Sequence, residues 1–250
     1  MILYVLLLLL FFGLFLFGLF QIYQQKAEQA EASAQNKALV ESSVKVVEPV
    51  ELPVEIEEEA PIVPPIQVDF PALLEKNPDV VGWLYCEDTN INYPVAQGVD
   101  NEQYLRRLLD GAYNRAGTIF MDSRNGADFS HWNTIVYGHN MKDDTMFAMV
   151  PSYADPAFYE AHPTWWLLTP EQNYRVDLIA GYPTKSNALL YTLPDQEAEQ
   201  KQVLENALRF SDFEAKVERD EADRLVTFST CLYDREDSRY VLMGILKEAQ

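Results

Sequence analysis

The chain has 250 residues and a net charge of −20, with 39 acidic side chains against 19 basic ones. This acidity argues against nucleic acid as a partner, because binding phosphates requires a positively charged face. With only two cysteines, a disulfide framework and a four-cysteine zinc site are also excluded, which leaves a single Cys86–Cys231 bridge as the one possible disulfide.

The first 20 residues contain no charged side chain. At about 1.5 Å per residue, a helix of this length matches a bilayer core of about 30 Å. We therefore expect a transmembrane anchor over residues 1–20. A cleaved signal peptide is the alternative: Ala32-Ser33-Ala34 suits a signal peptidase, but the apolar run is too long and no basic residue precedes it. The first basic residue, Lys26, follows the run, and weakly favours the orientation opposite to that of an exported domain.

Residues 21–69 are predicted to be an acidic, proline-rich linker. Repulsion between like charges and the stiffness of proline favour an extended chain, most strongly over Glu48–Pro65. Gln24–Val40 is rich in alanine, glutamate and glutamine and is suited to a short helix that continues from the anchor. The linker would hold a folded domain away from the membrane.

Residues 70–250 carry the patterns of one folded domain. Because its many short strands do not alternate regularly with helices, we expect a mainly β or α+β architecture, such as a closed barrel, and not a doubly wound parallel sheet. Pro94 places its strand at a sheet edge. Apolar spacing predicts helices from Phe70 to a break at Asn77-Pro78-Asp79, at Asp100–Leu109 and at Asp195–Phe210. Strands are predicted at Val80–Tyr85, Asn90–Val95, Ala116–Met121, Thr134–Tyr137, Trp165–Thr169, Tyr174–Gly181, Val226–Thr230 and Tyr240–Leu246.

The strongest chemical pattern is a strand that ends in a cysteine, followed by a polar loop and an arginine. Leu225–Thr230 alternates in polarity, and Cys231 ends this strand on its more polar side. Asp234–Ser238 reads as a solvated connection, and Arg239 opens the next strand. A cation beside a thiol favours the nucleophilic thiolate, and a guanidinium can stabilise negative charge on a carbonyl oxygen.

His139 is the candidate acid and base, because it directly follows a predicted strand and faces a polar loop. A purely structural histidine is the alternative, and it is the reading we adopt for His131 and His162. A zinc site of His131, His139 and Cys231 matches no compact ligand spacing. Cys86 follows an apolar run and reads as a small buried hydrophobe.

These residues resemble those of a known family. Phe228-Ser229-Thr230-Cys231 resembles the sortase Leu-x-Thr-Cys signature with phenylalanine in place of leucine, and Arg239 stands where sortases carry their arginine. Tyr137–Lys142, followed by Met146-Phe147, is similar to the histidine region of class B sortases. Three further segments resemble class B sequences in the same order: Asn77–Leu84, Asn92–Val95 and Gly117–Asp122.

The resemblance implies a sortase β-barrel with N-terminal helices, in which Asp195–Phe210 is a helix inserted between two late strands. It also implies a membrane-anchored cysteine transpeptidase on the outer face of a Gram-positive cell, with residues 70–250 as the extracellular catalytic domain. Cys231 would attack the threonine carbonyl of a Leu-Pro-x-Thr-Gly or Asn-Pro-x-Thr motif. Arg239 would stabilise the oxyanion, and His139 would protonate the leaving amine, without a metal or other cofactor.

The implied partners are a surface protein that carries the sorting motif and an amine of a peptidoglycan precursor or cross-bridge. Ser229 and Thr230 are predicted to line the peptide groove. Two alternatives stay open: a pilin-polymerising class B enzyme with a lysine acceptor, and an inert membrane-anchored binding module. The joint presence of Cys231, His139 and Arg239 argues against the second.

Overall fold

The computed structural model describes residues 2–47, 62–220, 223–233 and 237–249 of the chain. Eight strands form the closed barrel at its centre: β3 (Val80–Tyr85), β4 (Asn92–Ala96), β5 (Ile119–Met121), β6 (Asn133–Tyr137), β7 (Thr164–Leu168), β8 (Asn173–Lys185), β9 (Leu225–Cys231) and β10 (Ser238–Ala249). Around the barrel they run in the order β10-β8-β7-β3-β4-β5-β6-β9. Neighbouring strands are antiparallel except β4 with β5 and β6 with β9, which are parallel.

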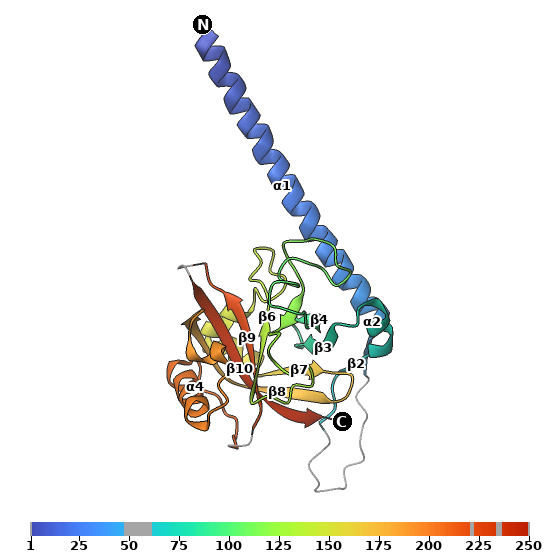
Figure 1. Ribbon diagram of the computed structural model, residues 1–250, viewed down its shortest axis with the longest axis vertical. Coiled ribbons are helices and arrows are strands. Elements are labelled where there is room, and N and C mark those ends of the chain that lie inside the picture. The colour runs from blue at the N-terminus through green and yellow to red at the C-terminus, as the bar shows by residue number, and fades with distance from the viewer. Residues whose placement is uncertain (1, 48–61, 221–222, 234–236, 250) are drawn as a thin grey trace.

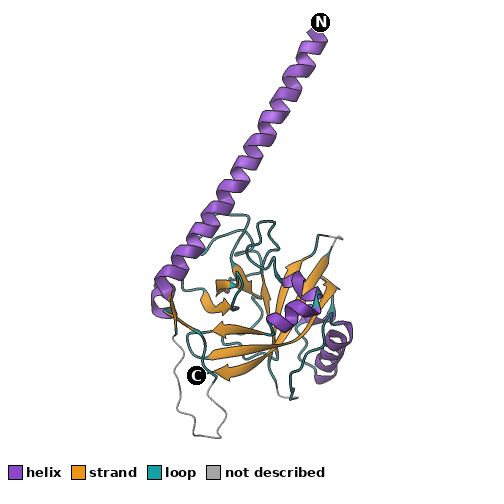
Figure 2. Ribbon diagram, turned by 180° about the vertical axis from the view of Figure 1, so that it is seen from behind, coloured by secondary structure: helices purple, strands orange, loops and turns teal. Residues whose placement is uncertain are grey.

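The helices lie outside the barrel: α1 (Ile2–Ser43), α2 (Phe70–Lys76), α3 (Pro156–Ala161) and α4 (Glu197–Phe210), with short 3-10 turns η1 (Val150–Ala154) and η2 (Leu189–Thr192). A small sheet pairs β1 (Val44–Val46) with β2 (Ile66–Val68). The first part of α1 extends far beyond the barrel, and α2 lies at the foot of this helix (Figure 1). The opposite side of the barrel carries α4, as the view from behind also shows (Figure 2).

The predicted fold class is confirmed. Each predicted strand corresponds to a barrel strand, and the predicted strands Trp165–Thr169 and Tyr174–Gly181 form the antiparallel pair β7–β8. The predicted helices at Phe70 and at Asp195–Phe210 are α2 and α4. Helix α4 follows β8 and precedes β9, so it is the helix inserted between late strands that the resemblance implies.

Aromatic rings fill the barrel next to the candidate cysteine strand. The Phe228 ring stacks on Trp165, with centroids 4.4 Å apart, and meets Phe147 edge-on at 5.9 Å. All three side chains are fully buried. Phenylalanine therefore fits in place of the family's leucine because a large apolar side chain is enclosed by two other rings.

The predicted helix over Asp100–Leu109 is wrong; this segment consists of turns. The Asp100 carboxylate accepts from the backbone N–H of Glu102 and Gln103 at 2.9 and 2.8 Å, as a capping side chain does at the start of a helix. Helical bonds do not follow, because the carbonyls beyond the cap bind partners further along the chain. The Tyr104 carbonyl accepts from Thr118 N at 3.0 Å and the Arg106 carbonyl from Asn114 N at 3.0 Å. The Leu105 carbonyl accepts from His139 Nε2 at 2.8 Å.

The prediction that Pro94 marks a sheet edge is also wrong, since β4 pairs with both β3 and β5. The pairing with β5 covers only Val95 and Ala96. Pro94 therefore has a partner in β3, Trp83, but none in β5.

The predicted linker over residues 21–69 is ordered at both of its ends. The suggested helix at Gln24–Val40 is confirmed, because α1 runs without a break from Ile2 to Ser43. Leu39 and Ser43 are buried, and β2 lies before the predicted domain boundary at residue 70. The apolar side chains that helix α1 buries against the barrel are the reason that the linker does not begin directly after residue 20. The extended stretch predicted at Glu48–Pro65 falls, for residues 48–61, outside the described residues.

The start of α1 is exposed and apolar. Its most apolar window of 18 residues has a mean hydropathy of 2.9 and contains no buried residue. Among the described residues, α1 is the one helix long and apolar enough to cross a membrane, as far as length and composition decide this.

Candidate active site

Cys231 and Arg239 are paired directly across two strands. They are register partners at the end of the antiparallel β9–β10 pair. Opposed residues in such a pair project from the same face of the sheet, with Cβ atoms roughly 5 Å apart. The two strands therefore place the thiol and the guanidinium side by side, as predicted.

His139 reaches the same place from the other neighbour of β9. Strand β6 runs parallel to β9 with Tyr137 opposite Ser229, so continued pairing brings His139 toward Cys231. Beyond the last pair, Gly138 N donates to Ser229 O at 3.2 Å and Thr230 Oγ1 donates to Gly138 O at 2.7 Å. Strand β9 thus lies between the strand that carries the histidine and the strand that carries the arginine.

Asn140 ties the histidine loop to the cysteine. Its Nδ2 donates to Cys231 O at 3.0 Å, and its own carbonyl accepts from the Tyr233 hydroxyl. The sequence shows Asn140 only as a polar residue of the loop that follows His139. The three candidate residues His139, Cys231 and Arg239 are thus brought together at one end of the barrel, where β6 and β9 end and β10 begins, and this end faces the side toward which α1 extends (Figure 1).

The ring of His139 is fixed by a backbone carbonyl. Its Nε2 lies 2.8 Å from Leu105 O. A carbonyl oxygen only accepts hydrogen bonds, so Nε2 carries the proton and Nδ1 keeps its lone pair. Burial lowers the pKa of His139 below 6.5, Arg106 lowers it further, and the bond to Leu105 acts in the opposite direction. The imidazole is therefore neutral at neutral pH and ready to accept a proton.

Gly138 allows the histidine loop to pack closely on the core. A Cβ atom at this position would lie 2.6 Å from the ring of Phe147. The backbone N–H of Phe147 also donates to His139 O at 2.9 Å. Phe147 in turn packs on Phe228. The position of His139 therefore depends on the aromatic core.

Ser229 and Thr230 are both buried in the structure. The Ser229 hydroxyl is 2.7 Å from the Tyr191 hydroxyl, while Thr230 bonds Gly138. A peptide would reach either side chain only by replacing these bonds, and their role in lining the groove stays a prediction.

Tyr191, in η2, is a site residue that sequence reasoning missed. Burial raises its pKa to about 12, the bond to Ser229 and the charge of Arg239 lower it, and the charge of Cys231 raises it. Tyr191 therefore lies within electrostatic reach of the cysteine and the arginine and remains a neutral phenol. No pattern in the sequence marks this tyrosine, because it follows β8 in an irregular turn.

The guanidinium of Arg239 has one hydrogen bond within the described residues. It donates from Nη1 to Ser238 O at 3.0 Å, and within the described ranges no carboxylate pairs with it. The acidic residues Asp234 and Glu236, interpreted as solvated, lie outside those ranges.

The other cysteine has the character predicted for it. Cys86 is buried in the barrel core, and burial raises its pKa to about 11, so it remains a thiol at neutral pH. Both Cys86 and Cys231 are free, which excludes a bridge between them.

The remaining histidines lie apart from this site. His131 Nδ1 is 3.2 Å from Asn125 Nδ2, and the His162 ring packs against Phe158. In the described part of the chain, no three His, Cys, Asp or Glu side chains are gathered as metal ligands, so His131, His139 and Cys231 form no such group there.

The chain is similar in sequence and in fold to known proteins, although no protein-family model matches it. Sortase B of Listeria monocytogenes is 38% identical over 177 residues, which are 70% of this chain and 72% of that protein. The structure of a Staphylococcus aureus sortase B–substrate complex superposes with a TM-score of 0.68 at 32% identity, covering 72% of this chain and 85% of that one. For Bacillus anthracis sortase B in complex with AAEK1 the TM-score is 0.71 at 29% identity, covering 90% and 99%. With a cysteine, a histidine and an arginine at one end of the same barrel, this chain belongs to the sortase B family.

Proposed function

We propose that Cys231, His139 and Arg239 carry out the acyl transfer that this sortase-type cysteine transpeptidase catalyses. The reaction cleaves a sorting motif after threonine and transfers the acyl group to an amine. One observation supports these roles above all: β9 carries Cys231 between the end of β6, which leads to His139, and the start of β10, where Arg239 lies opposite the cysteine.

In the first half-reaction, neutral His139 accepts the thiol proton of Cys231 at Nδ1 as the sulfur attacks the threonine carbonyl carbon. The carbonyl oxygen becomes an oxyanion, to which the Arg239 guanidinium donates. When this intermediate collapses, the C–N bond breaks and the imidazolium of His139 gives its proton to the leaving amine. The product is a thioester on Cys231.

In the second half-reaction, an acceptor amine attacks the thioester and His139 accepts the proton that the amine loses. Arg239 again stabilises the oxyanion. The C–S bond breaks, and Cys231 recovers its proton from His139. The chemistry requires only an uncharged amine. The acceptor that we propose is an amine of the cell wall, held by a peptidoglycan precursor or a cross-bridge.

We further propose that α1 anchors the enzyme to the cell membrane with the barrel outside the cell. The apolar start of α1 supports this location. The C-terminal ends of β6 and β9 face the side of the barrel toward which the exposed part of α1 extends (Figure 1). An anchored barrel would therefore present its catalytic end toward the membrane surface, where surface proteins leave the cell.

The test is peptide cleavage in the presence of an amine acceptor, with mass analysis of both products. Cys231→Ala is expected to abolish cleavage and transfer, whereas Cys86→Ala, which removes the buried thiol, keeps the catalytic end intact. Arg239→Lys keeps the charge but loses the planar fork, and we expect kcat/KM to fall by roughly 10²-fold or more. Full activity of Cys231→Ala would overturn the assignment, and a lysine side chain as the preferred acceptor would indicate pilin polymerisation.

A further inference from the structure

Two chain segments hold His139 in place, and both meet α1. The first is the irregular segment 104–118, which supplies Leu105 O to the ring Nε2 at 2.8 Å. The second follows the histidine, where Phe147 N donates to His139 O at 2.9 Å and Met146 N donates to the Tyr93 hydroxyl at 3.2 Å.

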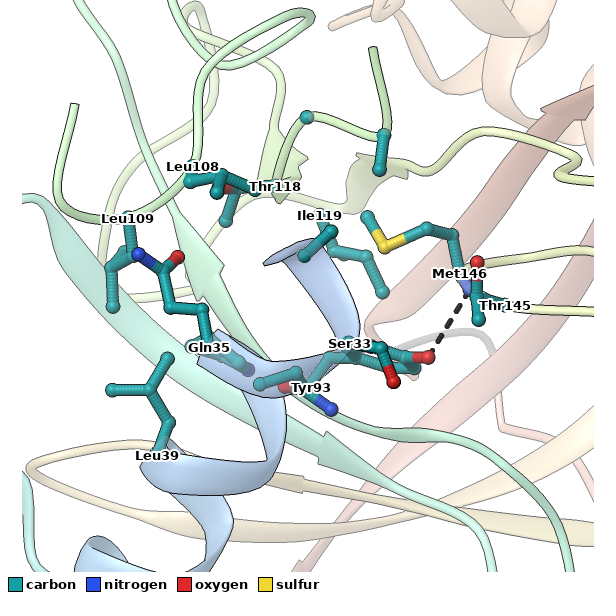
Figure 3. Close-up of a pocket in the computed structure, with 15 residues that line it drawn as sticks. Ser33, Gln35, Leu39, Tyr93, Leu108, Leu109, Thr118, Ile119, Thr145 and Met146 are labelled. Carbon is teal, nitrogen blue, oxygen red and sulfur yellow. Dashed lines mark hydrogen bonds between the residues drawn. The ribbon is translucent and has the colours of Figure 1, made fainter. Parts of the chain in front are cut away.

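Helix α1 lies where these two segments come together. A cavity of about 70 Å³ lies at this junction, and Figure 3 shows the residues that line it. Ser33 and Leu39 of α1 line it together with Leu108 from the first segment and Met146 from the second. The helix thus packs against both supports of the histidine.

The first segment folds back over the Leu105 carbonyl. Gly117 has a left-handed φ of 60°, and a Cβ atom there would lie 2.6 Å from both Tyr104 O and Leu105 O. Asn114 closes the fold, because its backbone N–H donates to Arg106 O at 3.0 Å and its carbonyl accepts from Gly117 N at 3.1 Å. The direction of the Leu105 carbonyl therefore depends on where Asn114 sits.

The side chain of Asn114 connects this fold to α1. It is 1% exposed, and Nδ2 donates to the backbone carbonyl of Glu28 at 2.8 Å, with the Glu31 carboxylate 3.4 Å away. Its Oδ1 accepts from Ala116 N at 3.0 Å. The neighbouring Arg115 forms an ion pair with Glu28 at 3.3 Å. One buried amide thus joins the helix to the segment that orients the catalytic histidine.

We propose that Asn114 is a positioning residue for the reaction, through which the Glu28–Glu31 turn of α1 fixes the Leu105 carbonyl and hence the ring of His139. The inference rests on the proposed role of His139. The Glu28–Glu31 turn of α1 then supports catalysis as well as tethering the enzyme. If α1 detaches from the barrel, the His139 ring loses the Leu105 carbonyl as its hydrogen-bond acceptor.

The test compares two asparagines at the same helix–barrel interface in the full chain in detergent. Asn114→Ala removes the link to His139. Asn36→Ala is the matched control, because Asn36 Nδ2 donates to Asn92 O of β4 at 3.2 Å and Asn92 bonds neither support of the histidine. Asn114→Asp keeps the size and the acceptor for Ala116 N but loses the donor, and it carries the test if the alanine variant does not fold.

We expect Asn114→Ala and Asn114→Asp to lower kcat by about tenfold with little change in KM, because the substrate still binds but the proton transfer is misaligned. In NMR titrations of ¹³C-labelled histidine, the pKa of His139 should rise toward 6.5 as the ring becomes hydrated, because burial is the main cause of its depression. Asn36→Ala should change neither quantity.

Unchanged kcat and an unchanged His139 titration in both Asn114 variants would overturn the inference, as would an equal effect of Asn36→Ala. A purely structural role would lower the melting temperature without moving the titration. Cys231→Ala, assayed in parallel, separates the two proposals: if it is inactive while the Asn114 variants are fully active, only this inference fails.

Discussion

The chemistry of this site depends on how each side chain is held. Cys231 and Arg239 need only the register of two adjacent strands, which local patterns predict well. His139 needs a distant carbonyl, that of Leu105, because this bond decides which ring nitrogen is free. The sequence could therefore identify the three residues, but it could not reveal the acceptor, which lies in a segment predicted to be a helix.

The pH dependence follows from the buried imidazole. Burial holds the pKa of His139 below 6.5, so the ring stays neutral down to that lower value and loses its ability to accept a proton only as the pH falls through it. We expect the acid limb of kcat/KM for peptide cleavage to lie below pH 6.5. Initial rates with a fluorogenic sorting peptide measure this limb. A limb at or above pH 6.5 would show that the ring is solvated in the free enzyme.

At the scale of elements, hydrophobic patterns in the sequence predicted the regular strands and helices. They failed where hydrogen bonds to distant residues determine the backbone conformation. The barrel strands, α2 and α4 follow from their apolar periodicity. The segment 100–109 has the same periodicity, yet its carbonyls bind Thr118, His139 and Asn114 in place of the next helical turn. Local sequence patterns cannot predict these hydrogen-bond partners, because the partners lie up to dozens of residues away.

Strand β9 shows how core packing supports the site. Phe228 lies between Trp165 and Phe147, and Phe147 packs on Gly138 beside the histidine. Phe228→Ala should lower the free energy of unfolding by about 3–5 kcal/mol through the cavity it leaves.

Phe228→Leu, which restores the family's usual residue, should cost less than about 1.5 kcal/mol. Denaturant unfolding of the two variants measures both values. Equal losses would mean that leucine does not fill the space of the phenylalanine, and that the ring contacts with Trp165 and Phe147 themselves stabilise the core.

At the scale of the whole molecule, α1 joins the apolar N-terminus to the barrel as one helix. Its 42 residues span roughly 60 Å at about 1.5 Å per residue. Contact with the barrel begins at Glu28, about two turns beyond residue 20. The sequence suggested this helix but not its docking, since the contacts join residues that are 86 positions apart.

This continuity predicts that the N-terminus is retained. Signal-peptide cleavage after Ala34 would cut α1 inside its docked part and remove Glu28 from Asn114. In a Gram-positive host we expect the protein in the membrane fraction, released by detergent and not by alkaline carbonate, with an intact mass that includes residues 2–20. A secreted protein that begins after Ala34 would contradict the anchor. A variant that lacks residues 2–20 is the control and should leave the membrane fraction.

Mass spectrometry of the enzyme shows whether Cys231 forms the acyl-enzyme. The full chain is incubated with a sorting-motif peptide without an acceptor amine, quenched in acid and digested. We predict a thioester adduct of the acyl part of the peptide on the fragment that contains Cys231, retained in Cys86→Ala, absent in Cys231→Ala, and discharged by an added amine. An adduct on another residue, or transfer to the amine by Cys231→Ala, would contradict the account.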